Sequence, residues 1–184
     1  MWSFDRRIVL RMGLVAVVGG LTAGCFQPMY GDSKVVPTAG LDDRLGAVDV
    51  LPITPPKGTR LARVGVEVRN DLIFNLTGGG RPQTSAFELK TQLSSNQQQV
   101  IVDINSGRPD IQEYTVIAAF TLVDVGTGKT VIIDTTFARV SYNIPGEQQR
   151  FAGERGLRDA ENRAAQVIAD NIRSRLASFF VAGT

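Results

Sequence analysis

Apolar residues recur every three or four positions in two segments of the chain, and at every second position between them. The first helical repeat follows Thr59 and carries Leu61, Val64, Val68, Leu72 and Leu76. This spacing places the apolar side chains along one side of an amphipathic helix. Thr59 is a suitable N-cap residue, and the run Gly78-Gly79-Gly80, followed by Pro82, predicts the end of the helix.

The second helical repeat covers residues 147–180. Its apolar positions are Leu157, Ala160, Ala164, Val167, Ile168, Ile172, Leu176 and Phe179. Gly153 and Gly156 lower the helix propensity of the first part, so we expect the firm helix to begin near Leu157. Asp159 and Glu161 are interpreted as solvated charges on its exposed side.

Alternation of apolar and polar residues predicts strands. A short strand spans 46–53, and a second begins at 87 and alternates through 93. The polar run 94–99 either bulges within one long strand that continues to 104 or separates two pieces. After a loop at 105–110, strands at 112–125 and 130–142 flank the tight turn Gly126-Thr-Gly-Lys129, the clearest hairpin signal in the chain.

The order of these elements is strand, helix, three strands, helix (β-α-β-β-β-α). It predicts an α+β, two-layer sandwich in which two helices pack on one face of a four-stranded, mostly antiparallel sheet. Residues 45–182 would form this single domain, a normal size for one hydrophobic core.

The first residues have the order of a secretory signal: the basic residues Arg6, Arg7 and Arg11, then an apolar run, then small residues. The run is roughly ten residues long, whereas a membrane-spanning helix needs about 20. Leu21-Thr22-Ala23-Gly24-Cys25 resembles a bacterial lipobox, so we expect a lipoprotein signal peptide at 1–24 and lipidation of Cys25. Residues 25–44 would be the acylated N-terminus and tether. The alternative is an ordinary secretory peptide with an incidental cysteine.

Charge and composition narrow the classes of function. The chain has 20 basic and 18 acidic residues, and residues 1–24 contain three Arg and one Asp, which leaves 17 of each after cleavage. A neutral body is unlike a nucleic-acid-binding protein, whose basic surface supplies most of the affinity. No cysteine follows Cys25, so no intrachain disulfide is possible.

Catalytic chemistry finds little support in this sequence. The chain has no histidine, the commonest general base and metal ligand. Known nucleophile, nucleotide and dinucleotide motifs are also absent. We therefore predict a protein that is not an enzyme, with no catalytic residues, no metal site and no cofactor.

Two features can serve binding instead. Three cations, Lys90, Arg108 and Lys129, stand at or beside expected strand ends, where they can donate to phosphates or acidic sugars. A glutamine-rich region from Gln92 to Gln112 forms either a polar binding face of the sheet, for a protein or a glycan, or an ordinary solvated face.

Several segments together resemble a known family. They are Cys25-Phe-Gln-Pro-Met-Tyr-Gly31, Val66-Glu-Val-Arg-Asn-Asp-Leu72 before its glycine stop, Tyr142-Asn143, Phe151-Ala152, Asp159-Ala-Glu-Asn-Arg-Ala-Ala165 and Ile168-Ala-Asp-Asn-Ile-Arg-Ser-Arg-Leu176. In order and spacing, across residues 21–182, they are similar to the lipopolysaccharide (LPS)-assembly lipoproteins of the LptE type, in their alphaproteobacterial form.

This resemblance implies a lipoprotein anchored in the outer membrane through the lipid at Cys25, on its periplasmic side. It implies a large outer-membrane β-barrel as partner, the LPS translocon subunit, which the lipoprotein plugs and helps to assemble while LPS passes to the outer leaflet. It also implies LPS contact by basic residues at one end of the sheet, and Lys90, Arg108 and Lys129 are the candidates. The alternatives are a transport-auxiliary lipoprotein of a periplasmic lipid or solute export system, or a structural envelope lipoprotein.

Overall fold

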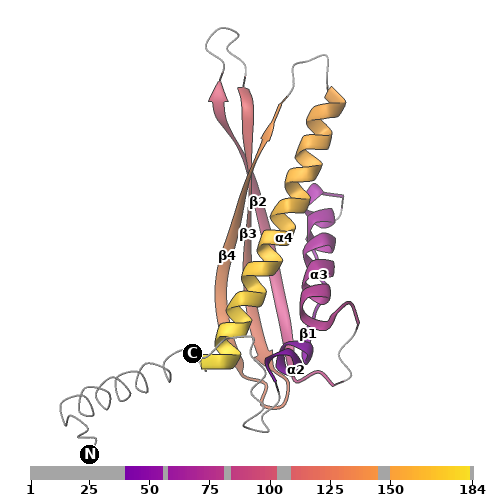
Figure 1. The fold of residues 1–184 in the computed structure, drawn as a ribbon, viewed down its shortest axis with the longest axis vertical. Coiled ribbons are helices and arrows are strands. Elements are labelled where there is room, and N and C mark those ends of the chain that lie inside the picture. Colours follow the sequence, from indigo (N-terminus) through magenta and orange to yellow (C-terminus); the bar gives the residue numbers. More distant parts are fainter. Residues whose placement is uncertain (1–39, 56–57, 81–83, 103–108, 145–149, 183–184) are drawn as a thin grey trace, which may run out of the picture. The chain divides into compact units, whose positions relative to one another are not determined.

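The computed structural model describes residues 40–55, 58–80, 84–102, 109–144 and 150–182 (Figure 1). Cys25, the expected signal peptide and the expected tether up to residue 39 lie outside these ranges. The elements, in chain order, are α2 (Leu41–Gly46), β1 (Val48–Val50), α3 (Arg60–Thr77), β2 (Phe87–Val102), β3 (Pro109–Asp124), β4 (Thr130–Asn143) and α4 (Arg150–Ala182). This is the predicted α+β arrangement with one additional short helix.

The four strands form one sheet in the order β1-β2-β3-β4. Strand β1 is parallel to β2 and pairs with only its first three residues, Val48 with Phe87 through Val50 with Leu89. Strands β2, β3 and β4 form an antiparallel meander. Strand β2 is continuous, with a register shift between Gln99 and Ile101, so the long strand with a bulge is the correct alternative.

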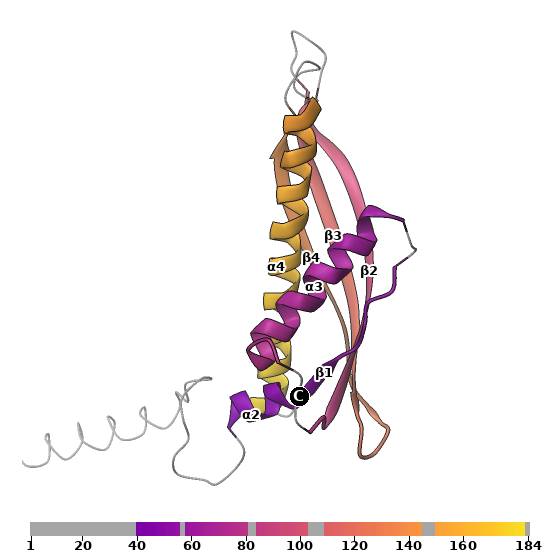
Figure 2. The same ribbon diagram turned by 90° about the vertical axis from the view of Figure 1, so that its right-hand side faces the viewer.

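Helices α3 and α4 cover one face of the sheet, with α4 running along β3 and β4, and α3 beside it near β1 and β2 (Figures 1 and 2). The core lies between the two layers because every second strand residue faces the helices. Strand β3 contributes five alternate residues, and all are buried: Tyr114, Val116, Ala118, Phe120 and Leu122. The apolar stripes of both helices meet them.

Helix α3 has the predicted boundaries. Thr59 occupies the N-cap position with extended backbone, and Gly78 ends the helix in the left-handed conformation at φ 71°. Its stripe of Val64, Val68, Leu72 and Leu76 is buried. The local sequence therefore predicted both ends of this element.

The N-terminal part of the described chain differs from expectation. Leu41 to Arg44, assigned to the tether by sequence, belong to helix α2, whose Leu45 is 1% exposed. The Arg44 guanidinium donates a hydrogen bond to the carbonyl of Phe180 at 3.0 Å. It thus satisfies one of the carbonyls that the last turn of α4 leaves open.

Helix α4 also differs in detail. It begins at Arg150 and passes through Gly153 and Gly156, several residues before the expected start at Leu157. At its C-terminal end Phe180 is buried, and Val167 is 42% exposed although it was placed in the apolar stripe. Phe180 packs against Phe87 with ring centroids 5.1 Å apart, which joins the helix end to the start of β2.

Glu161 is not a solvated helix charge. It is 2% exposed and forms an ion pair with Arg63 of α3. Asp159 does behave as expected, since it is exposed and pairs with Arg163 one turn later at 2.8 Å. The difference arises because Glu161 points between the two helices, where α3 covers it.

Candidate functional site

The face of the sheet turned away from the helices carries exposed apolar side chains. Ile133 is 79% exposed, Phe137 59% and Ile117 41%. Ile117 lies directly opposite Phe137 in the β3–β4 ladder, and Thr121 opposite Ile133. These three residues, with Ala119 between them, form an apolar strip on what we term the open face. Exposed apolar residues gathered on one face mark an interaction site more often than scattered ones do.

Cations stand at both ends of this strip. Lys90 of β2 pairs with Thr121 in the ladder, in the same row as Ile133. Arg139 of β4 lies over the ring of Phe137, 5.3 Å from its centroid. The rows of Ile133 and Arg139 lie six positions apart along β4, which corresponds to about 20 Å along the strand. Both cations are more than half exposed, at 56% and 64% of the side-chain surface.

Each cation has an acidic neighbour at long distance. Nζ of Lys90 lies 3.9 Å from a carboxylate oxygen of Glu88, and Nε of Arg139 lies 3.9 Å from Oε1 of Glu113. Such exposed, loosely held pairs contribute little free energy. The cations therefore remain available to an anionic ligand that approaches the open face.

The structure brings together only part of the predicted cation set. Lys90 lies on the open face, and Lys129 is exposed in the β3–β4 turn, just before Thr130, which pairs with Val123 at the same end of the sheet. Arg108 lies outside the described residues. Two of the three candidates thus share one end of the sheet.

Sequence reasoning missed Arg139. Its signal was present, because Arg139 alternates with Ala138 and Val140, both buried, in β4. Alternation places Arg139 on the same face as Phe137, two residues earlier. The alternation within β4 could not show that Ile117 of β3 pairs with Phe137. This pairing places the apolar strip beside Arg139.

The glutamine-rich region does not form one face. Gln92 and Gln98 belong to the open face, whereas Gln97 and Gln99 point to the opposite side of β2. Gln112 of β3 is partly buried on the helix side, where its Oε1 accepts a hydrogen bond from the hydroxyl of Tyr142. The prediction of a single glutamine face is therefore wrong.

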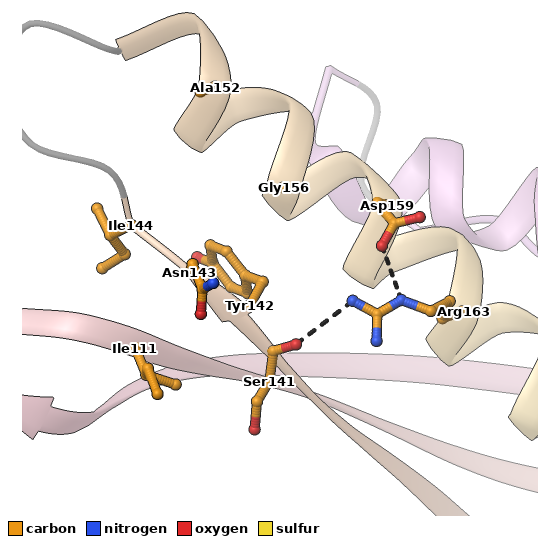
Figure 3. A pocket seen from close by; sticks show the side chains of 9 residues that line it. All are labelled: Ile111, Ser141, Tyr142, Asn143, Ile144, Ala152, Gly156, Asp159 and Arg163. Carbon is orange, nitrogen blue, oxygen red and sulfur yellow. Dashed lines mark hydrogen bonds and ion pairs between the residues drawn. The ribbon is translucent and has the colours of Figure 1, made fainter.

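A second candidate is a groove of about 790 Å³ between the end of β4 and the first half of α4 (Figure 3). Gly156 forms part of its wall, and an added Cβ there would stand 3.4 Å from the carbonyl oxygen of Asn143. Arg163 reaches into it but donates to Asp159 at 2.8 Å and to the carbonyl of Ser141 at 3.3 Å (Figure 3). Burial raises the pKa of the Tyr142 hydroxyl. Because the Arg163 charge is already compensated, this groove is a poorer anion site than the open face.

Neither a metal cluster nor a membrane-spanning helix occurs in the described part of the chain. No three His, Cys, Asp or Glu side chains within it converge as metal ligands. None of its helices combines the length and the apolar composition that crossing a membrane requires.

The chain is similar to one known protein family and to several solved structures. Residues 45–176 match the sequence model of the family LptE, described as lipopolysaccharide-assembly. No curated protein matches the chain significantly. A Caulobacter crescentus CB15 protein, described as a candidate lipoprotein, has a similar structure with a TM-score of 0.60, at 22% identity over 79% of this chain and 98% of that chain.

Two further solved structures share the fold. Rare lipoprotein B of Shewanella oneidensis matches with a TM-score of 0.52, at 17% identity over 73% of this chain and 96% of its own. A minor lipoprotein of Acinetobacter baumannii matches with a TM-score of 0.50, at 12% identity over 71% of this chain and 88% of its own. At these identities, the structural similarity shows a common fold.

Proposed function

Because the chain belongs to the LptE family of lipopolysaccharide-assembly lipoproteins, we propose that it assists the insertion of LPS into the outer leaflet of the outer membrane. The observation that carries this proposal is the family match over residues 45–176, nearly the whole folded domain. The lipoproteins with the same fold support it.

The protein would be held at the periplasmic side of the outer membrane by lipid on Cys25. Its partner would be a large β-barrel, the LPS translocon subunit, whose lumen the domain plugs and whose assembly it assists. Equal numbers of acidic and basic residues after residue 24 suit a domain that sits in a hydrated lumen.

The open face is the surface that we assign to LPS. LPS combines phosphate groups with acyl chains, so its recognition requires cations beside an apolar surface. Lys90 and Arg139 supply the cations, and the strip of Ile117, Ile133 and Phe137 supplies the apolar surface. Arginine and lysine donate charge-assisted hydrogen bonds to phosphate. Lys129 extends the basic end, and Arg108 stays a candidate from sequence.

The role in the translocon is tested by isolation and depletion. The protein, tagged after Thr184, is extracted from outer membranes in mild detergent. We expect one large β-barrel protein to co-purify in stoichiometric amount, together with LPS. Depletion should leave newly made LPS short of the cell surface. An inner-membrane transporter in place of the barrel would favour the transport-auxiliary lipoprotein, and no partner with normal surface LPS would favour the structural one.

LPS contact is tested by charge reversal on the open face. Lys90→Glu with Arg139→Glu should weaken LPS binding at least about tenfold, since each charge-assisted hydrogen bond contributes about 1.5–3 kcal/mol. The control is Arg155→Glu with Arg158→Glu, which makes the same change of charge at two exposed positions of α4. Equal LPS binding by the two double variants would contradict the assignment of this face. Barrel association and the melting temperature of both double variants should equal those of the wild type, which would show that folding is intact.

A further inference from the structure

One edge of the sheet has no strand beside it over most of its length. Strand β1 pairs with β2 only from Phe87 to Leu89, whereas β2 continues to Val102. The last backbone hydrogen bond on that side within the described chain runs from the Leu51 amide to the carbonyl of Leu89, 3.0 Å long. From Lys90 onward no further strand of the described chain pairs with this side of β2. Thr91 is still buried, so we refer to residues 93–99 on this side as the free edge.

The register shows which backbone groups the free edge presents. The amide of Phe87 donates to Ala47 and the carbonyl of Leu89 accepts from Leu51, so the odd-numbered residues of β2 face the β1 side. Even-numbered residues bond to β3 instead, because successive residues of a strand direct their backbone groups to opposite sides. The residues of the free edge that offer both amide and carbonyl to a further strand are therefore Leu93, Ser95, Gln97 and Gln99.

On the outer sides of β1 and of β4, helix side chains form hydrogen bonds with backbone carbonyls. Arg69 of α3 donates to the carbonyl of Val50 in β1 at 3.2 Å. Along β4, Asn171 of α4 donates to the carbonyl of Phe137 at 3.5 Å, and Arg163 to that of Ser141 at 3.3 Å. Strand β4 also carries charged residues, which discourage pairing with another strand.

The free edge has none of these protections in the described structure. Residues 94–100 are all exposed, and their sequence, Ser-Ser-Asn-Gln-Gln-Gln-Val, contains neither a charge nor a proline. Natural proteins place lysine, proline or covering elements on edge strands to prevent association. An edge strand that keeps a long uncharged run exposed is suited to accept a further strand.

We propose that the free edge of β2 binds an extended, uncharged polypeptide segment of the β-barrel partner, which adds to the sheet as a further strand. This inference rests on the proposed function. Strand addition takes its affinity from main-chain hydrogen bonds and its selectivity from flanking side chains. Neutral, hydrogen-bonding side chains on both sides of the added strand favour a segment without charges. Because a closed barrel has no free strand edge, the segment must come from a loop or terminus of the barrel protein.

A second copy of this chain is a poorer occupant on geometric grounds. Gly40 lies shortly before β1 in the chain. If two copies paired their β2 strands antiparallel, the two Gly40 residues would therefore lie at opposite ends of the combined sheet. A strand of 16 residues is about 53 Å long, and the 15 residues from Cys25 to Ala39 reach about 50 Å when fully extended. Two copies anchored in one membrane could satisfy this pairing only with one tether stretched to its limit.

Hydrogen–deuterium exchange at single-residue resolution tests the proposal on the protein extracted in detergent, alone and with its barrel. In the free protein the amides of Gln92, Asn96 and Gln98 should already exchange slowly, because they bond to β3. The amides of Leu93, Ser95 and Gln97 should exchange quickly when the protein is alone and slowly in the complex. Equal exchange of these odd-numbered amides in both states would overturn the proposal.

A proline at the free edge gives an independent measurement. Gln97→Pro removes a donor that faces solvent, a position at which edge strands tolerate proline, and should raise the Kd for the purified barrel about fivefold or more. Gln97→Ala is the matched control, because it removes the same side chain and keeps the amide, and should bind as the wild type does. Ser95→Pro replaces Gln97→Pro if that variant does not fold. Wild-type affinity in a folded proline variant would overturn the proposal.

The two proposals fail in different ways. A stoichiometric barrel complex with unprotected odd-numbered amides would leave the proposed function intact and refute strand addition. Failure to obtain any barrel complex would refute both. A stable dimer of the free protein in which these amides are already protected would assign the free edge to a second copy.

Discussion

At the scale of single residues, Glu161 departs furthest from what its neighbours in sequence indicate. It is 2% exposed between helices α3 and α4, and its carboxylate pairs with Arg63, whose side chain keeps 35% of its surface exposed. One oxygen of the carboxylate has no hydrogen-bond partner within the described chain. Burying a charge is costly unless it is paired, so the stability of the helix pair depends on Arg63.

This unequal burial predicts an unequal response to mutation. Arg63→Ala leaves a buried carboxylate without its counter-ion and should lower the free energy of unfolding by about 3–5 kcal/mol. Glu161→Ala leaves an arginine that can turn to water, so its cost should be smaller. The double variant should be more stable than Arg63→Ala. Urea unfolding of the three variants measures these differences, and equal losses from the two single variants would contradict the account.

Asp134 links β4 to α4 and predicts a pH dependence. Its carboxylate accepts hydrogen bonds from the Thr135 backbone amide at 2.7 Å and from Nε of Arg175 at 2.9 Å. These bonds, the backbone one first, lower the pKa of Asp134 from its ordinary value of 3.8. A lowered folded-state pKa contributes stability above the unfolded value, which is lost as the pH falls through the folded-state pKa.

We therefore expect the stability difference between the wild type and Asp134→Asn to be constant at neutral pH. It should shrink as the pH falls below 3.8. Urea midpoints of both proteins between pH 7 and pH 2 provide the measurement. High salt should reduce the part that comes from Arg175, since that pair is partly exposed. A difference that stays constant throughout this range would exclude Asp134 as the source.

At the scale of elements, the ends of helix α3 were predictable because they are encoded locally. Gly78 adopts φ 71°, a conformation that other residues adopt only at a cost, and its amide donates to the carbonyl of Phe74 at 3.0 Å. The continuity of β2 was not predictable from local sequence. Its polar run is equally typical of a break, and only pairing with β3 along its length makes it one strand.

Glycine substitution after α3 separates conformation from packing. Gly78→Ala should lower the free energy of unfolding by about 1–2 kcal/mol, because a Cβ disfavours the left-handed conformation. Gly80→Ala is the control, since Gly80 does not have positive φ and nothing lies within 4 Å of an added Cβ. Thermal or urea unfolding of both variants measures the effect. A loss at Gly80 as large as that at Gly78 would show that the conformation of Gly78 is not the cause.

At the scale of the whole domain, the sheet has one face that builds the core and one that remains open. The buried face is covered by α3 and α4 (Figure 2). The open face keeps Ile133 and Phe137 exposed at 79% and 59%, so these side chains contribute little to folding. Apolar residues that do not stabilise the fold are available for binding.

This separation of folding from binding predicts that the apolar strip can be removed without unfolding the domain. Ile133→Thr with Phe137→Thr should change the free energy of unfolding by less than about 1 kcal/mol. LPS binding should fall about tenfold or more, because a buried apolar side chain contributes about 1.5–3 kcal/mol. Val66→Ala with Phe74→Ala, at exposed positions of α3, is the control for lost apolar surface. Comparable losses of LPS binding in both double variants would locate the contact elsewhere.

The sequence by itself determined the two helices, the alternating strands, the hairpin turn and the glycine stop of α3, because periodicity and turn chemistry act over a few neighbouring residues. The family resemblance was likewise readable from sequence and is confirmed by the match over residues 45–176. Only the tertiary structure decided that Glu161 is buried, that Lys90 and Arg139 flank one apolar strip, and that one edge of β2 is free. Each of these depends on which distant element covers a given face or edge, and local periodicity contains no information about that partner.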